Sequence, residues 1–217
     1  MDEIRIEGLE LSCIVGVRRR ERRKKQPVRL DLTLGLDAAA AGQTGKIGLT
    51  CDYSRVADEV TRLLRFREYR LIEVATEELA AMLFGVHSVL ERVDIRLEKP
   101  NALHGRARSA SVQISRARSH FARRSIEREQ HRFDVLLETH EAGLYLVHVP
   151  PGRQVSLRAP VERRLAWVTA GELVQDDRVL ASGNLVDFVR GVSNLVVNRS
   201  DEAAELFFCT CPRFLGT

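Results

Sequence analysis

The segment Val28-Arg29-Leu30-Asp31-Leu32-Thr33-Leu34-Gly35-Leu36 decides the fold of the first half of this 217-residue chain. Apolar residues stand at every second position from Val28 to Leu36, and mostly polar residues stand between them. Side chains of a β-strand alternate between the two faces of its sheet. The segment therefore predicts a strand with one face in the core and one face in water.

The sequence on either side of this strand predicts a ββααββ unit. Apolar alternation also marks an upstream strand, with a phase slip near Gly8, and two helical patterns follow downstream. Ser54 is a candidate cap for the first helix, and Gly85 is a candidate end for the second. Two hairpins that flank a helix pair imply an α+β fold, an antiparallel sheet with two helices on one face. The further expected elements are strands over residues 4–15, 93–97 and 110–114 and helices over residues 56–64 and 73–84.

The pattern of apolar and polar residues changes past the midpoint of the sequence. Residues 118–130 are polar and rich in Arg and Ser, which predicts a linker with room for one helical turn between a domain over residues 1–117 and a domain over residues 131–217. From Phe133 onward, short apolar runs are separated by turn signals such as Pro150-Pro151-Gly152. This pattern predicts an all-β sandwich or jelly roll. Its expected strands cover residues 133–137, 144–149, 165–169, 195–198 and 206–211.

Composition is typical of a globular protein. Hydrophobic residues make up 44% of the chain, which is enough for packed cores. Four cysteines do not make a disulfide framework, so we expect buried free thiols in a reducing compartment. The N-terminus lacks a signal-peptide core, and no apolar run approaches the roughly 20 residues that cross a membrane. We therefore expect a cytoplasmic protein with no membrane partner.

The net charge of +4 has its origin in one segment. Residues 18–25 hold seven basic residues around Glu21. Clustered guanidinium groups bind phosphate well, so this segment either faces solvent or an oligomer neighbour, or it favours a phosphorylated ligand. It lacks the interleaved aromatic residues of nucleic-acid-binding surfaces. We therefore expect no nucleic-acid partner.

Four polar residues lie at or near the ends of the expected strands and helices. They are Glu21, Tyr53, Glu73 and Lys99. Together they supply a base, an acid, a proton carrier and an anchor for a flat amide-like ring, which is most of what a proton-transfer enzyme needs. Each of them alone also has a structural explanation, as a solvated loop residue, a packing residue, a helix-terminal acid or a strand-end lysine.

The motifs of the first half, in their order and spacing, resemble those of the dihydroneopterin aldolase family. They are Ile4-Arg5-Ile6-Glu7-Gly8-Leu9, Ile14-Val15-Gly16-Val17 followed by Glu21, Gln26-Pro27, Asp52-Tyr53, Leu71-Ile72-Glu73 and Lys99-Pro100. The resemblance covers about residues 1–117. It implies the T-fold, a homo-oligomer (a tetramer or an octamer) with active sites at subunit interfaces, and no metal or organic cofactor.

The resemblance implies a pterin-processing lyase of folate biosynthesis. Such an enzyme cleaves dihydroneopterin to 6-hydroxymethyl-dihydropterin and glycolaldehyde by a retro-aldol reaction. A dihydropterin carries a C=N bond beside the breaking bond, so the substrate is its own electron sink and the protein need only bind the ring and move protons. Epimerisation of dihydroneopterin or its triphosphate shares the cleaved intermediate and stays an alternative. A non-catalytic pterin- or metabolite-binding regulator is a further alternative, although it has no need of an intact set of proton-transfer residues.

By the same resemblance, Glu73 would accept the adjacent N–H donors of the pterin's 2-amino-4-oxo edge. Ile72 would contribute its backbone to ring binding. Lys99 would hold the catalytic proton, and Glu21 would pair with Lys99 and fix its orientation and pKa.

The resemblance brings Asp52 and Tyr53 to the same site. Tyr53 would act as acid or base on the side-chain hydroxyls and would enter the pocket from the neighbouring subunit. The ring would stack near Asp52-Tyr53. The expected catalytic residues are therefore Lys99, Tyr53 and Glu21, and the expected substrate-binding residues are Glu73, Ile72, Asp52 and Tyr53.

The second half resembles the cupin family without its metal ligands. The similar segments are Pro151-Gly152, Trp167–Glu172 and Gly191–Asn198. Residues at or near the usual ligand positions are Arg158, Pro160, Arg164 and Asn194, and the upstream histidines are His131, His140 and His148. A transition-metal site needs about three or four convergent ligands, so we expect no metal here. On its apolar strand, His148 is expected to be a hydrogen-bonded core or rim residue.

Overall fold

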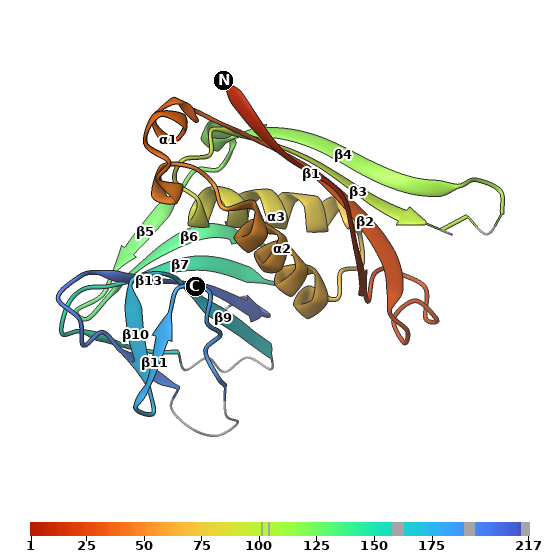
Figure 1. The fold of residues 1–217 in the computed structure, drawn as a ribbon. Coiled ribbons are helices and arrows are strands. Elements are labelled where there is room, and N and C mark those ends of the chain that lie inside the picture. The colour runs from red at the N-terminus through yellow and green to blue at the C-terminus, as the bar shows by residue number, and fades with distance from the viewer. Residues whose placement is uncertain (101, 104, 158–162, 189–193, 214–217) are drawn as a thin grey trace. The chain divides into compact units, whose positions relative to one another are not determined.

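The computed structural model divides the chain into two compact units, unit 1 (Met1–His120) and unit 2 (Phe121–Thr217) (Figure 1). The structure describes residues 1–100, 102–103, 105–157, 163–188 and 194–213. None of the helices in these ranges is both long enough and apolar enough to cross a membrane.

Unit 1 combines one antiparallel sheet with helices. Its elements are β1 (Asp2–Cys13), β2 (Gln26–Leu36), α1 (Ala39–Thr44), the 3-10 helix η1 (Ile47–Leu49), α2 (Tyr53–Arg67), α3 (Ile72–Val86), β3 (Arg92–Pro100), β4 (Ser109–Ala117) and the 3-10 helix η2 (Arg118–His120). The strand order is β1-β2-β3-β4. On one face of the sheet, α2 packs against β1 and α3 packs against β3 and β4 (Figure 1). The predicted α+β arrangement is confirmed, while the short helices α1 and η1 were not predicted.

Strand β2 has the two faces that its alternation predicts. Val28, Leu30 and Leu34 are fully buried. Arg29 is exposed and Asp31 is half-buried on the opposite face. Complete burial of each leucine side chain contributes about 1.5–3 kcal/mol, so this strand anchors the core of unit 1.

Strand β1 contains the irregularity expected near Gly8. The register with β2 shifts between the pairs Ile6–Leu32 and Leu9–Leu30, which leaves one extra residue on β1. Gly8 has a φ of +68°, and its N–H donates to Asp31 Oδ1 at 2.7 Å. This β-bulge resets the alternation, as glycine bulges commonly do.

The cap of α2 differs from the prediction. Helix α2 begins at Tyr53, so Ser54 already lies inside it. The cap is Asp52, whose Oδ1 accepts the N–H of Ser54 at 2.9 Å and that of Arg55 at 3.3 Å. Aspartate is among the best N-cap residues because its carboxylate satisfies free N–H groups and faces the positive helix end.

The end of α3 also differs from the prediction, since the helix continues through Gly85 to Val86. The guanidinium of Arg118 donates to the carbonyl oxygens of Phe84 at 2.8 Å and His87 at 2.7 Å, and to those of Ser88 and Leu90. A side chain from a distant segment therefore satisfies the carbonyls at this helix end, and no glycine cap is required.

Residues 118–130 hold more structure than the expected linker. Arg118–His120 forms η2 within unit 1, and β5 (Arg124–Glu127) pairs with β6 (Arg132–Glu138). The polar side chains of this segment lack the apolar alternation from which a strand is predicted. The division between the two units falls inside this segment, after His120.

Unit 2 is all-β over its described residues, as predicted. Its strands are β5 (Arg124–Glu127), β6 (Arg132–Glu138), β7 (Gly143–Val149), β8 (Gln154–Ser156), β9 (Arg163–Ala170), β10 (Glu172–Gln175), β11 (Arg178–Ala181), β12 (Leu195–Val197) and β13 (Ala204–Cys211). They form two antiparallel sheets, with strand orders β5-β6-β7-β13-β9 and β11-β10-β12-β8. Strands β8, β10 and β11, each three or four residues long, were not predicted.

The two sheets of unit 2 share one apolar core. Tyr145 and Phe208 from the first sheet belong to the same buried cluster as Leu173 and Val196 from the second. The rings of Tyr145 and Phe208 have centroids 6.2 Å apart. Two sheets that bury one common face form a β-sandwich, the architecture expected of a jelly roll.

Candidate active site

A cavity of about 220 Å³ opens in unit 1 beside the loop after β1, the end of β3 and the N-terminus of α3. Of the residues expected in the site, it brings together Glu21, Ile72, Glu73 and Lys99. These four come from segments far apart in sequence. The other described lining residues are Val15, Gly16, Val17, Arg18, Arg70, Leu71, Ala102 and Ala110.

Lys99 reaches the cavity because of the alternation of β3. Leu97 is buried on the helix-covered face of the strand, and Lys99 follows it two positions later on the same face. Only 9% of Lys99 is exposed. Its ammonium group donates to the carbonyl oxygen of Val15 at 3.2 Å and forms an ion pair with Glu21. A charged group this buried requires such acceptors.

Glu21 lies in the loop between β1 and β2, where one carboxylate oxygen accepts from Lys99 and the other accepts the N–H of Arg18 at 2.9 Å. Burial alone would raise the pKa of Glu21. The hydrogen bonds from Lys99 and from the Arg18 backbone outweigh burial and hold this pKa below its ordinary value. Glu21 is therefore an ionised partner for Lys99.

The carbonyl of Val15 connects two parts of the site. It accepts from Lys99 and also from the side-chain amide of Gln26, the first residue of β2. Gln26 thereby helps to orient the acceptor that holds the ammonium group. Gln26 was expected only as part of a motif, and its contact with a backbone oxygen has no sequence signal of its own.

The segment that precedes α3 anchors the loop that carries Glu21. The carbonyl of Tyr69 accepts the N–H of Gly16 at 2.9 Å and the guanidinium of Arg22 at 3.1 Å. The Tyr69 hydroxyl donates to the buried carboxylate of Glu78 at 2.8 Å, which fixes the tyrosine. These contacts, which were not predicted, tie the loop of Glu21 to the chain that leads into Glu73.

Glu73 lies in the first turn of α3 and exposes its carboxylate to the cavity. Within the described part of the chain, no hydrogen bond or ion pair occupies this carboxylate. The N-cap residue Leu71 offers no side-chain acceptor to the helix, so the positive end of the helix dipole faces the same region. The carboxylate is therefore available to accept hydrogen bonds from a ligand.

The structure does not bring Asp52 and Tyr53 into this cavity within one chain. Asp52 caps α2, and Tyr53 is the first residue of that helix, with 63% of its surface exposed. Neither residue lines the cavity that holds Lys99 and Glu73.

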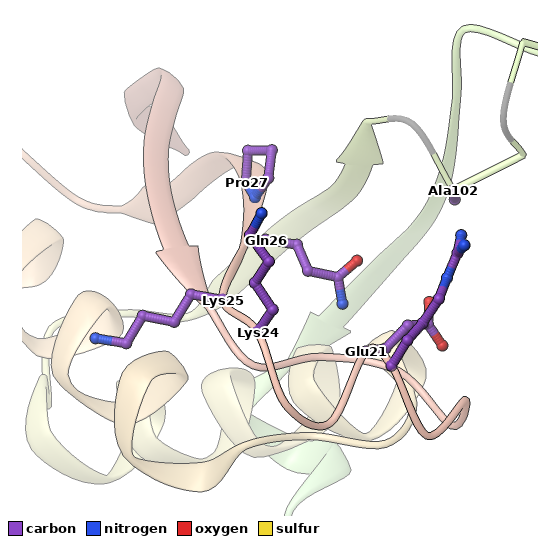
Figure 2. Close-up of a pocket in the computed structure, with 7 residues that line it drawn as sticks. Glu21, Lys24, Lys25, Gln26, Pro27 and Ala102 are labelled. Atoms are coloured by element: carbon purple, nitrogen blue, oxygen red, sulfur yellow. The ribbon is translucent and has the colours of Figure 1, made fainter.

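A second cavity, of about 300 Å³, adjoins the first because Glu21 and Ala102 line both. Its remaining described lining is strongly basic (Figure 2). It consists of Arg20, Lys24, Lys25, Gln26 and Pro27.

The cysteines of unit 1 are buried as expected. Burial raises the pKa of the Cys13 thiol to about 11 and that of Cys51 to about 12. Cys209 of unit 2 is buried too, whereas Cys211 is only half-buried, which corrects the expectation for that residue. Thiols with such raised pKa values are poor nucleophiles, and neither Cys13 nor Cys51 is among the described residues that line the cavity.

His148 of unit 2 is hydrogen-bonded, as predicted. Its Nε2 lies 2.8 Å from Asp134 Oδ2 and its Nδ1 lies 2.8 Å from Glu205 Oε1. Burial opposes the charged imidazolium, but the bonds to Glu205 and Asp134 outweigh it and raise the pKa of His148.

The structure covers only part of the cupin-like motifs. Arg158, Pro160 and Gly191 lie outside the described residues. Arg164 donates to the carbonyl of Leu157 at 3.0 Å, and Asn194 is buried. Among the residues that are described, no three His, Cys, Asp or Glu side chains are placed to hold a metal ion.

Residues 4–115 match the protein family described as FolB, dihydroneopterin aldolase. The dihydroneopterin aldolase of Bacillus subtilis is 27% identical over 120 residues, which are 55% of this chain and 100% of the relative. A dihydroneopterin triphosphate 2'-epimerase of Pseudomonas aeruginosa is 25% identical over 115 residues, which are 53% of this chain and 92% of the relative.

Solved structures show the same likeness. The dihydroneopterin aldolase of E. coli, solved in complex with neopterin, is 27% identical with a TM-score of 0.51 and covers 54% of this chain and 100% of that chain. A sugar phosphate isomerase of the cupin superfamily from Silicibacter pomeroyi is 23% identical with a TM-score of 0.34, over 43% of this chain and 72% of that chain. The second likeness is weak, and the sandwich architecture of unit 2 rests on its own sheets and core.

Proposed function

The chain belongs to the dihydroneopterin aldolase family through residues 4–115, and from this membership we propose that it cleaves dihydroneopterin to 6-hydroxymethyl-dihydropterin and glycolaldehyde. One observation carries the proposal. The buried Lys99–Glu21 pair and the open carboxylate of Glu73 line the same cavity. A proton carrier beside an acceptor for the ring is the equipment that a pterin lyase requires.

Ring binding is assigned to Glu73 and the start of α3. The pterin edge presents adjacent N–H donors, and a carboxylate accepts two of them in parallel. Ile72 lines the same cavity, and we assign to its backbone a polar contact with the ring.

The chemistry is a transfer of one proton from oxygen to carbon. The proton of the second side-chain hydroxyl leaves, the bond between the first and second side-chain carbons breaks, and its electrons enter the ring C=N bond. Glycolaldehyde departs, and protonation of the first side-chain carbon restores the C=N bond. We assign the proton transfers to Lys99 with Tyr53, while ionised Glu21 holds Lys99 in place.

Tyr53 is assigned to the site of a neighbouring copy. The residue is 63% exposed at the start of α2 and is not among the described residues that line the cavity of its own chain. A homo-oligomer, a tetramer or an octamer, would bring Asp52-Tyr53 of one subunit beside the ring bound to the next.

Epimerisation is the second candidate activity, because a relative named dihydroneopterin triphosphate 2'-epimerase matches 53% of the chain. Both reactions pass through the same cleaved intermediate. An epimerase lets glycolaldehyde add back to the opposite face before it leaves, so the two activities differ in retention of the aldehyde.

The test is incubation of the full chain with dihydroneopterin, followed by assay of glycolaldehyde and chromatography of the pterins. We expect glycolaldehyde and 6-hydroxymethyl-dihydropterin in equal amounts, and neither from Lys99→Ala. A protein that binds neopterin but yields neither glycolaldehyde nor an epimer would be a pterin-binding regulator, and the proposal would be wrong.

The domain limits and the cellular location belong to the same proposal. We assign catalysis to a domain over residues 1–117, which is followed by a separate cupin-like β domain over residues 131–217. Residues 118–130, the expected linker, connect the two domains and contain η2 and β5. The family match that ends at residue 115 supports the first limit. The free cysteines fit the reducing cytoplasm, where we place the enzyme.

A further inference from the structure

The basic cavity next to the proposed pterin site has no role in the cleavage chemistry. Arg20, Lys24 and Lys25 line it, and Glu21 is its acidic residue among those described. Figure 2 shows Lys25 pointing away from Glu21, while the Gln26 side chain extends toward the side of the cavity where Glu21 and Ala102 lie. The cavity is thus a concave, cationic extension of the first one.

The described lining of this cavity holds three basic side chains and one carboxylate, so its formal charge is positive. The carboxylate of Glu21 already accepts from Lys99 and from the Arg18 N–H. No acidic side chain in the described ranges lies within ion-pair distance of Lys24 or Lys25. A cavity with excess cationic charge and a polar amide in its wall is suited to an anion.

The position of the cavity fits one part of a pterin. With the ring edge on Glu73, the C6 side chain passes the Lys99–Glu21 pair, where its bond is cleaved. Beyond Glu21 the first cavity continues into the basic one, since Glu21 and Ala102 line both. In this orientation the terminal oxygen of the three-carbon side chain would point toward the basic cavity.

We propose that the basic cavity is a phosphate subsite and that the preferred substrate carries a phosphate ester at the end of the side chain. This inference rests on the proposed function, because Glu73 and Lys99 set the direction in which the substrate lies. Guanidinium and ammonium groups bind phosphate oxygens through charge-assisted hydrogen bonds. The cavity of about 300 Å³ has room for a phosphate chain.

The experiment compares dihydroneopterin with its triphosphate as substrates of the full chain. The test variant is the double change Arg20→Ala/Lys24→Ala. The control is Arg19→Ala/Arg23→Ala, which removes the same charge from the same exposed loop at residues that line neither cavity. Because both variants lose the same net charge, general electrostatic attraction of the substrate falls equally in both.

We expect the wild-type protein to have the higher kcat/KM with the triphosphate. The ratio of kcat/KM for the triphosphate to that for dihydroneopterin should fall about tenfold or more in the test variant. In the control the same ratio should change less than about twofold. Equal kcat/KM for the two substrates in the wild-type protein, or an equal fall in both double variants, would overturn the inference.

A binding measurement separates this inference from the proposed activity. The dissociation constants of neopterin and neopterin triphosphate need no turnover and are measured by calorimetry on the same three proteins. If dihydroneopterin is cleaved but the two ligands bind equally, the lyase stands and the phosphate subsite is wrong. If neither substrate is cleaved but the triphosphate binds more tightly, and only the test variant loses this advantage, the subsite stands and the activity is wrong.

Discussion

The carboxylate of Glu21 occupies the space that a side chain at Gly16 would need. A β-carbon at position 16 would lie 2.5 Å from Glu21 Oε2, a distance that real side chains do not adopt. Gly16 also has a φ of +130°, which residues other than glycine rarely take. Because Glu21 in turn pairs with Lys99, the bare backbone at Gly16 determines where the proposed proton carrier is held.

Gly16→Ala should therefore reduce kcat/KM for dihydroneopterin by about a hundredfold, since a displacement near 1 Å in an active site has that effect. The control is Gly45→Ala, where φ is +67° but no atom lies within 4 Å of the added methyl group. This substitution strains the backbone, but the added methyl group meets no neighbouring atom. Steady-state kinetics of the two variants, compared at temperatures where both are equally folded, measure this effect. An unchanged kcat/KM in Gly16→Ala would show that the placement of Glu21 does not affect catalysis.

Glu73→Ala and Lys99→Ala should affect different steps. Glu73 offers an unoccupied acceptor to the ring, so its loss should weaken neopterin binding about ten- to hundredfold. Lys99 carries the proton, so its loss should abolish turnover while the dissociation constant of neopterin changes only modestly. Calorimetry and single-turnover kinetics separate the two effects. Normal turnover in Lys99→Ala would contradict the assigned role.

Mixing two inactive proteins tests the interfacial site. Tyr53→Phe and Lys99→Ala should each be inactive alone. If Tyr53 acts in the cavity of a neighbouring subunit, random mixing after dissociation gives about one quarter of sites with both native residues, and activity returns to about that fraction. Gel filtration of each variant confirms that the oligomer re-forms. Continued inactivity of a properly re-formed mixture would place Tyr53 and Lys99 in the same chain's site or exclude Tyr53 from catalysis.

His148 should make the stability of the protein depend on pH. Its pKa is raised in the folded state, so its bonds to Asp134 and Glu205 stabilise the protein fully below the unfolded pKa of about 6.5. This contribution is lost as pH rises through the raised value. The difference in free energy of unfolding between wild type and His148→Gln should therefore be larger near about pH 6 than near about pH 9.

Urea denaturation at the two pH values measures this difference. The matched control is His140→Gln, because the side chain of His140 is 91% exposed and makes only a long contact with Glu141. That variant should show no such pH dependence. A constant difference for His148→Gln would mean that the imidazole does not gain a proton on folding.

Arg118→Ala should destabilise unit 1 by about 2–4 kcal/mol, because it leaves several carbonyl oxygens at the end of α3 without their donor. Arg116→Ala is the control. It removes the same side-chain type two positions away, where the guanidinium forms an ion pair with Glu77, whose side chain is 34% exposed. The loss of this partly exposed ion pair should cost less than about 1 kcal/mol. Thermal denaturation would compare the two, and equal losses would show that Arg118 is not a helix cap.

The four strands and the two long helices of unit 1 were predictable because their signals are local. The alternation of β2 and the phase slip at Gly8 depend on a few neighbouring residues, and the candidate site residues Lys99 and Glu73 were chosen from short motifs. The cap that Arg118 provides was not predictable, because it joins residues about 30 positions apart. The segment that begins at Arg118 was accordingly interpreted as a linker.

The site contacts that could not be predicted from the sequence are mostly hydrogen bonds to backbone carbonyl oxygens. The Val15 carbonyl accepts from Lys99 and Gln26, and the Tyr69 carbonyl accepts from Gly16 and Arg22. Every residue has a carbonyl, so no residue type marks these acceptors. Their directions follow from loop geometry that only the folded chain defines.

Because of its bulge, β1 can lose one residue at Gly8 without a change in its register with β2. Leu9 lies opposite Leu30 and Ile6 opposite Leu32, with one residue on β2 and two on β1 between the pairs. A chain without Gly8 would pair Glu7 with Asp31 and leave both flanking pairs in register. Deletion of Gly8 would therefore leave the loop that carries Glu21 in its place. Deletion of Leu11 would instead move the side chains between that position and the loop to the opposite face of the sheet.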